Sequence, residues 1–363
     1  MPHPCLRPSL AALMPLCVFG AAHAQSSVTL YGIADMYGQY ARSDDASITR
    51  LQSGGLSGSR LGFKGLEDLG GGLSADFVLE MGLAMDTGSL GQGGLAFGRQ
   101  AFVRISDQNL GRLSLGRQYS SLYVATDEFS AFSSSGYGPS TAVIGGFGGY
   151  EPVGGSSDSA TGSGGPGRLN NSVAYVSPSW GGFRIGATGG FGEVVNGAGD
   201  NRVWDAFVRY TKGGFDAIIS FDDDQGGAVT PDAHRRTWTG AAKYALGNWQ
   251  VLGGYLYTQD RSPANQSGSG AWLGMGYTFG ASLVEVQYVE NNPRYIDDAK
   301  TQALGVGYEY NFSKRTTLYS ALTYFKNGGN AGNGRASFSI PNGLGNPDAN
   351  DYTEVVAGMR FRF

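Results

Sequence analysis

The last twelve residues, 352 to 363, constrain the fold of this chain more than any other stretch. They read YTEVVAGMRFRF, and in a strand their side chains would alternate between two faces. One face would hold Thr353, Val355, Ala357, Met359, Phe361 and Phe363. The other would hold Tyr352, Glu354, Val356, Gly358, Arg360 and Arg362. A final strand that is apolar on one side, charged on the other and aromatic at its end fits the closing strand of an outer-membrane β-barrel.

The same two-residue alternation recurs along the chain. In the stretch 302–312, Leu304, Val306 and Tyr308 share one face, opposite small and polar residues. Comparable stretches occur at 204–211, 271–279 and 282–288. From Gln25 onward no helical period is found. We predict an all-β, transmembrane antiparallel barrel of about 16 strands, which is too wide for side chains to fill and so holds water.

The connections between these stretches alternate in length. Short ones such as Lys212–Gly214 and Gly247–Asn248 alternate with long ones such as Ser43–Gly55 and Asp223–His234. Outer-membrane barrels have short periplasmic turns and long external loops. The long connections are therefore expected outside the cell.

One connection, Ser120 to Gly167, is exceptionally long and contains no convincing strand. Loops of this length are usually functional or disordered, and disorder is a real alternative for the second half, Gly154–Gly167. The first half carries many apolar side chains, including Leu122, Phe129 and Tyr137. These need a surface to pack on, and the nearest is the inner wall. We therefore predict that residues 120–167 fold inward as a constriction loop.

The start of the chain predicts export. Arg7 precedes an apolar run, Leu10 to Gly20, and Ala22-His23-Ala24 matches a cleavage signal. Residues 1–24 are expected to be a cleaved signal peptide and residues 25–363 the barrel. Both cysteines, Cys5 and Cys17, lie in the removed segment, which excludes disulfides and thiolate metal sites. A lipoprotein site at Cys17 is disfavoured because small residues do not precede it.

The charge and hydropathy exclude other classes. The chain has 26 Lys and Arg against 30 Asp and Glu, so it lacks the excess of basic residues that a nucleic-acid-binding surface needs. No apolar run is long enough for a membrane helix. Mean hydropathy is only −0.19, which a membrane protein tolerates if half of each strand faces water.

Several ordered motifs resemble the Gram-negative general (diffusion) porins, nearest the betaproteobacterial and neisserial type. They are Gly58–Gly70 (GSRLGFKGLEDLG), Gly98–Val103 (GRQAFV), Leu115–Tyr119 (LGRQY), Val28–Gly32 (VTLYG), Asn171–Tyr175 (NSVAY) and the terminal Phe363. The resemblance covers essentially the whole mature chain. It implies a homotrimer of 16-stranded barrels whose third external loop folds inward.

The resemblance also implies a pore constriction with arginines opposite acidic residues of the inward loop. The arginines that match by motif position are Arg60, Arg99 and Arg168, with Arg117 close by. Related loops often carry an acidic Pro-Glu-Phe-Gly-Gly turn, which this chain lacks. Asp127 and Glu128 are the best acidic candidates. The alternative to a role in the constriction is that each arginine forms an ion pair with a neighbouring carboxylate on the water-facing side of the barrel wall.

Other polar groups favour no further chemistry. Asp222-Asp223-Asp224 lacks the later glutamate of a calcium loop, so a solvated external loop is expected. His234, the only histidine past the signal, is expected as an external-loop residue. Neither catalytic residues, a metal site nor a cofactor is predicted. Two alternatives stay open, a barrel-embedded hydrolase and a sealed structural or adhesive barrel.

Together these features predict an outer-membrane channel for passive diffusion of small hydrophilic solutes and ions. A weak anion preference is expected, because the arginines of the motifs outnumber the two acidic loop candidates and locally outweigh the net charge of −5 past the signal, much of which lies in loops. Past the signal there are 19 arginines and six lysines, a bias that favours rigid guanidinium groups over flexible ammonium groups. The expected partners are two further copies of the chain and outer-membrane lipid, including lipopolysaccharide.

Overall fold

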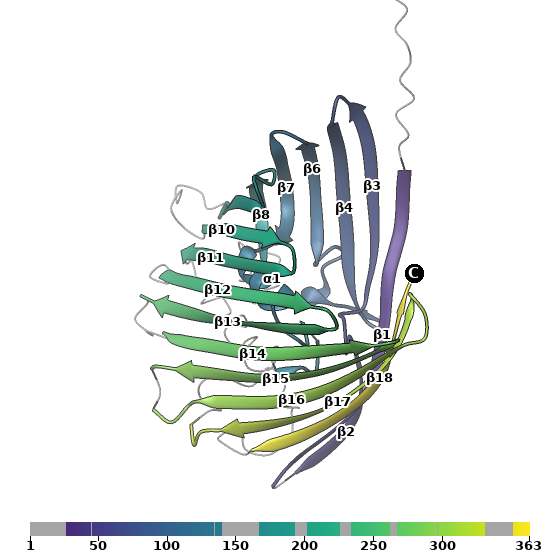
Figure 1. Cartoon of the computed structure of the whole chain (residues 1–363), viewed down its shortest axis with the longest axis vertical. Coiled ribbons are helices and arrows are strands. Elements are labelled where there is room, and N and C mark those ends of the chain that lie inside the picture. Colours follow the sequence, from purple (N-terminus) through teal and green to yellow (C-terminus); the bar gives the residue numbers. More distant parts are fainter. Residues whose placement is uncertain are drawn as a thin grey trace, which may run out of the picture.

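In the computed structural model, the chain forms one antiparallel sheet that closes on itself (Figure 1). The structure describes residues 27–44, 46–133, 135–139, 167–192, 202–225, 234–261, 267–295, 297–330 and 351–363. The predicted signal peptide and residues 140–166 of the long loop lie outside these residues. In the described part, no helix is both long and apolar enough to cross a membrane.

Sixteen strands make the wall of the barrel. They are β1 (Ser27–Ser43), β3 (Arg60–Gly70), β4 (Leu73–Ala84), β6 (Gln100–Asp107), β7 (Gly111–Tyr119), β8 (Arg168–Val176), β9 (Phe183–Gly190), β10 (Val203–Lys212), β11 (Phe215–Gln225), β12 (His234–Leu246), β13 (Trp249–Asp260), β14 (Gly268–Phe279), β15 (Ser282–Pro293), β16 (Thr301–Asn311), β17 (Thr316–Asn327) and β18 (Tyr352–Arg362). Two extra strands, β2 (Ser47–Ser53) and β5 (Ser89–Leu90), and two helices, η1 (Gln92–Gly94) and α1 (Ser121–Glu128), lie in connections.

The barrel closes between its first and last strands. β1 pairs with β18 over Ile33–Ser43 and with β3 over Ser27–Ile33. At the junction, the Gly32 amide donates to the Phe363 carbonyl at 3.0 Å, and the Phe363 amide donates back at 3.1 Å. The terminal aromatic residue is therefore part of the seam, as the sequence predicted.

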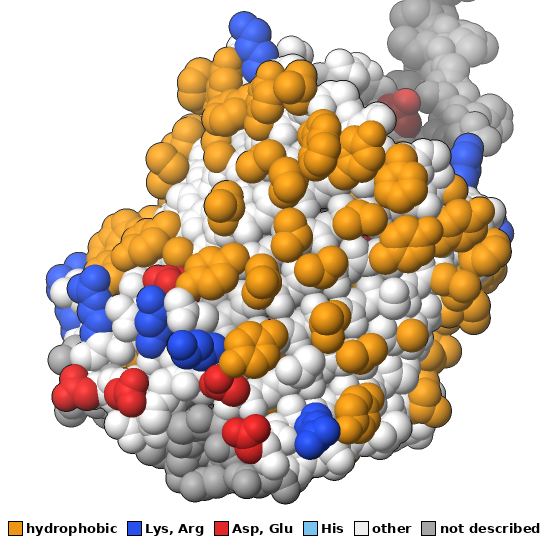
Figure 2. Space-filling model, turned by 60° about the horizontal axis from the view of Figure 1, so that its bottom comes forward, with side chains coloured by type: hydrophobic (Ala, Val, Ile, Leu, Met, Phe, Trp, Pro, Cys, Tyr) orange, Lys and Arg blue, Asp and Glu red, His pale blue; other side chains and the backbone are white. Residues whose placement is uncertain are grey.

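The two faces of the sheet differ as the alternation predicted. On β18, Val355 and Met359 are 49% and 52% exposed, whereas Glu354 and Val356 are each 1% exposed. On β16, Leu304 is 50% exposed and Ala303 is 2% exposed. The apolar exposed face is the outside of the barrel, and it forms a broad band of hydrophobic side chains (Figure 2). The buried, more polar face is the inside.

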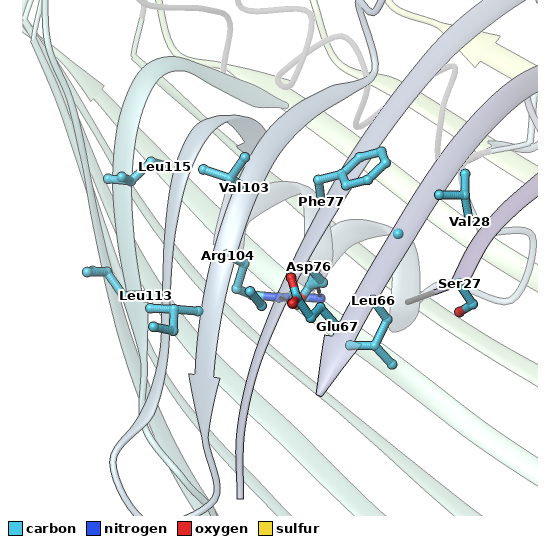
Figure 3. A pocket seen from close by; sticks show the side chains of 13 residues that line it. Ser27, Val28, Leu66, Glu67, Asp76, Phe77, Val103, Arg104, Leu113 and Leu115 are labelled. Carbon is cyan, nitrogen blue, oxygen red and sulfur yellow. Dashed lines mark hydrogen bonds and ion pairs between the residues drawn. The ribbon is translucent and has the colours of Figure 1, made fainter. Parts of the chain in front are cut away.

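A shallow groove crosses the outer surface of β1, β3, β4, β6 and β7 (Figure 3). Its lining is mostly apolar and includes Val28, Phe77, Val103 and Leu115. Val28 and Val103 are 69% and 57% exposed. This part of the outer surface is therefore apolar, like the rest of the band.

Two expectations for the connections were wrong, and a third connection holds an extra strand. The stretch 43–55 contains β2, which pairs with Met36–Arg42 of β1. This part of β1 follows the part that pairs with β3. Asp222-Asp223-Asp224 is not a solvated loop but part of β11, where Asp222 is 4% and Asp223 9% exposed. His234 is the first residue of β12 rather than a loop residue. In each case the backbone ladder continues past the apolar alternation, because paired polar residues extend the strands.

The chain also forms a helix that the sequence analysis did not find. α1 follows β7 directly and is only eight residues long. The Ser120 hydroxyl caps its first turn by accepting from the Tyr123 amide at 3.1 Å. A helix this short has too few residues to show a clear period.

Candidate functional site

The described start of the long loop, residues 120–133 and 135–139, packs on the inner face of the barrel. Asp205 on β10 accepts from both the amide and the hydroxyl of Ser121, at 2.8 and 2.6 Å. Asp205 is 3% exposed, so this carboxylate faces the start of α1 and not the water of the channel. A carboxylate at a helix N-terminus also stabilises the helix dipole.

Beyond α1 the loop is fixed to strands on the far side of the inner wall. The Trp272 indole on β14 donates to the Phe129 carbonyl at 2.7 Å. The Gln287 amide on β15 donates to the Ser130 hydroxyl at 2.9 Å. Phe129 itself is 0% exposed. The described loop therefore crosses the inner face instead of projecting into solvent.

The last described residues of this part of the loop belong to an aromatic cluster. Tyr137 stacks on Tyr319 of β17 with ring centroids 5.4 Å apart, and it meets Tyr37 of β1 edge-on at 5.9 Å. Phe132 packs in the same cluster. Burial, and then the carboxylates of Glu285 and Glu309, raise the pKa of Tyr137 well above its usual value, so its hydroxyl stays neutral.

Two predicted arginines share one carboxylate on the wall. The Arg99 Nε donates to Glu80 Oε1 of β4 at 2.8 Å, and Arg60 Nη1 lies 3.8 Å from the same oxygen. The Tyr31 hydroxyl donates to the other oxygen of Glu80 at 2.9 Å. Arg99 is nearly buried, whereas the Arg60 side chain is 20% exposed. Sequence reasoning missed Glu80, although its place on the wet face of a strand could have been found by alternation.

Of the other two predicted arginines, Arg117 lies at a β-bulge, and Arg168 lies just beyond it, paired with Tyr119. The register between β7 and β8 shifts between Gly116 and Gln118. The Arg117 Nε donates to the Gly98 carbonyl at 2.7 Å, and its Nη1 donates to the Asn170 side chain. A bulge changes the direction of a side chain. Here it falls at Arg117, which is only 8% exposed.

Arg168 connects this wall to the loop. Its guanidinium carbon lies 5.1 Å from the ring centroid of Tyr119 on β7 and 5.7 Å from that of Tyr123 on α1. The two rings stack on each other at 4.4 Å. Tyr119 also accepts from Arg99 at 2.8 Å. The structure thus brings all four predicted arginines together on β3 to β8 and the loop joining β4 to β6.

The two predicted acids lie at the end of α1. Glu128 Oε2 is 2.7 Å from Arg209 Nη2 of β10, and Arg209 also binds Asp216 of β11 at 2.6 Å. Lys243 of β12 donates to the Glu128 carbonyl at 3.1 Å. Asp127 precedes Glu128 and is half-buried. Glu128 therefore pairs with Arg209, a cation that the sequence analysis did not include in the site.

No metal centre is found among the described residues, where no group of three or more histidine, cysteine, aspartate or glutamate residues could hold an ion. The described inner wall thus contains arginines, tyrosines and carboxylates bound to one another. Such a wall can sort solutes by charge and size.

Comparison with known proteins gives the family. The model of the Gram-negative porin family matches residues 9–330. The chain belongs to the Gram-negative porins. An outer membrane porin protein 32 of Delftia acidovorans is 34% identical over 338 residues, covering 89% of this chain and 90% of the relative. An outer membrane porin protein of Bordetella pertussis is 31% identical, covering 88% of this chain and 94% of that protein.

A solved structure supports the same conclusion. The anion-selective porin from Comamonas acidovorans matches with a TM-score of 0.78 and 28% identity, covering 93% of this chain and all of that one. This porin is therefore an outer-membrane β-barrel that provides a channel for passive diffusion. The resemblance stated from the motifs is confirmed.

Proposed function

We propose that this porin is a weakly anion-selective channel for small hydrophilic solutes and ions, with its long loop as the constriction. The observation that carries the selectivity is the arginine cluster on one wall. Arg99 and Arg60 share the buried carboxylate of Glu80, and Arg117 donates to the Gly98 carbonyl next to Arg99. Arg168 lies on the ring of Tyr119, whose hydroxyl Arg99 also contacts. Fixed guanidinium groups beside an aqueous path favour anions. The likeness to a porin described as anion-selective supports the same sign.

The constriction is proposed because the described loop occupies inner-wall space from β10 to β17. A loop lying there narrows the channel, so it sets a size limit. The arginine wall lies beside the loop helix, since Arg168 contacts Tyr123 of α1. Solutes that pass the loop would therefore pass the arginines.

We further propose a homotrimer and no catalytic activity. The trimer is supported by the resemblance of the motifs, and the apolar outer surface is compatible with contacts to lipid or to a second copy. Against the hydrolase alternative, Nε2 of His234 lies 2.7 Å from an oxygen of Asp223, which Arg236 Nε also binds at 3.1 Å. His234 thus shares the carboxylate of Asp223 with Arg236 at the end of a strand, which is an ordinary polar contact of the wall.

Planar-bilayer recording of the purified protein tests this function. We expect stepwise conductance in symmetric salt, with closures in groups of three equal steps. A barrel-embedded hydrolase would conduct little and would lose its activity on His234→Ala. A structural or adhesive barrel would give no steps. Absence of conductance from correctly folded protein would therefore reject the channel, and single independent steps would reject the trimer.

A further inference from the structure

The inner wall carries a second group of arginines, away from the proposed constriction. Arg104 of β6, Arg112 of β7 and Arg184 of β9 lie near the short turns that join β6 to β7 and β8 to β9. We call these three residues the short-turn arginine cluster. In outer-membrane barrels the short turns face the periplasm. The cluster therefore lies at the periplasmic mouth of the barrel.

Alternation along the strands turns the three side chains of the cluster inward. The residues that directly follow them, Ile105, Leu113 and Ile185, are 44%, 42% and 44% exposed on the outer, apolar face. Successive side chains of a strand point to opposite faces. The guanidinium groups of the cluster therefore face the lumen and not the lipid.

The strand register brings the members of the cluster together. Arg104 lies opposite Ser114, two residues from Arg112, so the two arginines are diagonal neighbours on adjacent strands. Such neighbours are about 7–8 Å apart and within reach of long side chains. On its other side, Arg112 is separated from Arg184 by the single strand β8. The charged groups that act on Arg112 are Arg104, Arg184 and Asp76.

Only one arginine of the cluster has a counter-charge. Arg104 Nη2 lies 2.9 Å from Oδ1 of Asp76 on β4, and the two side chains lie side by side in Figure 3. Arg112 and Arg184 are both exposed, and neither has an ion pair or a side-chain hydrogen bond within the part of the chain that the structure describes. Three guanidinium groups thus share one described carboxylate, which leaves two positive charges over.

This arrangement favours a particular kind of anion. Like charges gathered on one wall repel one another, and an anion with two or more charges placed between them offsets that repulsion. Guanidinium groups bind carboxylate and phosphate oxygens through two parallel hydrogen bonds, a geometry that a spherical chloride ion does not offer. The chemistry of the cluster therefore fits a multivalent oxyanion better than a halide.

The cluster is separate from the arginines of the proposed constriction. Arg117 lies five residues further along β7 than Arg112, which corresponds to roughly 15 Å in a strand. Arg117 donates to the Gly98 carbonyl and to Asn170, whereas Arg112 is only the second residue after the turn. The two groups of arginines can therefore be changed independently by mutation.

We propose that the short-turn arginine cluster is a binding site for small multivalent oxyanions at the periplasmic mouth of the barrel. An oxyanion bound there by two or more guanidinium groups is retained, whereas chloride passes. The inference rests on the proposed channel, because the ligand reaches the cluster through the water of the lumen.

Isothermal titration calorimetry of detergent-solubilised porin with inorganic pyrophosphate and with citrate, at low salt, tests this site. Wild-type protein should bind at least one of the two anions. The double variant Arg112→Gln, Arg184→Gln should bind it at least about tenfold more weakly, because charge-assisted hydrogen bonds are lost. Each single variant should show a smaller loss. Binding of pyrophosphate alone would assign phosphate chemistry to the site, and binding of citrate alone would assign carboxylate chemistry.

The matched control removes two exposed charges at another short turn. Lys314→Gln, Arg315→Gln changes the turn between β16 and β17 and should keep the wild-type affinity. Stepwise conductance of the cluster variant in a planar bilayer shows that it folds.

The proposal would be overturned by unchanged affinity in the cluster variant, or by an equal loss in the control variant. A loss confined to Arg60→Gln, Arg168→Gln would place the anion at the constriction and would also overturn it. A wild type that does not conduct would reject the proposed function. A wild type that conducts but binds neither anion would reject the oxyanion site alone.

Discussion

At the scale of single residues, buried arginines of the inner wall are stabilised by carboxylates paired with them. Glu80 is 3% exposed, and it compensates Arg99 directly and Arg60 at longer range. A buried guanidinium without a partner is strongly unfavourable, because its desolvation is no longer offset. Glu80 therefore fixes the orientation of Arg99 and Arg60.

This gives a stability prediction. Glu80→Gln should lower the free energy of unfolding by roughly 3–5 kcal/mol, because Arg99 stays buried without its counter-charge. Urea unfolding in lipid vesicles, followed by tryptophan fluorescence, measures the change. Glu67→Gln, at an exposed position on β3, is the control and should cost little. An equal cost for both variants would mean that the Glu80 pair contributes nothing specific.

At the scale of elements, hydrogen bonds to the barrel wall hold the loop helix in place. Asp205 binds the first residue of α1, and Trp272 and Gln287 bind the segment that follows the helix. These contacts come from three different strands, so the loop is fixed across the wall and not at one point.

Removing the first anchor should loosen the loop without opening the barrel. In Asp205→Ala, the buried amide and hydroxyl of Ser121 lose their acceptor, at a cost of about 1–3 kcal/mol. We expect noisier open-channel current and faster protease cleavage within the loop. Asp297→Ala, an exposed aspartate in another loop, is the control. Unchanged noise and cleavage in the Asp205 variant would show that this anchor does not hold the loop.

Removing the loop itself tests its place in the channel. Deleting residues 125–149 should raise single-channel conductance, because less protein would lie across the inner wall. The measurement is the step size in symmetric salt. Unchanged steps would place the loop outside the conducting path and would contradict the constriction.

The sequence predicted correctly those features that depend only on neighbouring residues of one strand. The alternation on β16 and β18 assigned inside and outside correctly, because successive side chains in a strand must point to opposite faces. It did not find β2, and it was wrong at Asp222–Asp224, where polar pairing prolongs a strand without apolar alternation. It also missed the pairing of Glu128 with Arg209, because contacts between a loop and a distant strand depend on the path of the loop, which alternation does not specify.

At the scale of the whole molecule, the barrel depends on one seam. Gly32 lies against the terminal residue, and a Cβ there would lie 2.3 Å from the Phe363 ring and 2.7 Å from the Arg60 carbonyl. The backbone oxygen leaves little freedom to relax. Glycine is therefore needed where the first strand meets the last.

A single methyl group should disturb this seam. Gly32→Ala should destabilise the folded barrel by about 1–3 kcal/mol through overpacking, seen as a lower temperature for the mobility shift of folded protein on gels. Gly240→Ala is the matched control, because a Cβ at Gly240 meets nothing within 4 Å. Equal shifts for the two variants would show that the seam tolerates a side chain.

The reversal potential across a planar bilayer in a potassium chloride gradient tests the central claim most directly. The account predicts a potential of the sign for chloride preference in the wild type, and a clear decrease in Arg60→Gln, Arg117→Gln, Arg168→Gln. A cation-selective wild type, or an anion preference unchanged by the loss of these three arginines, would contradict it.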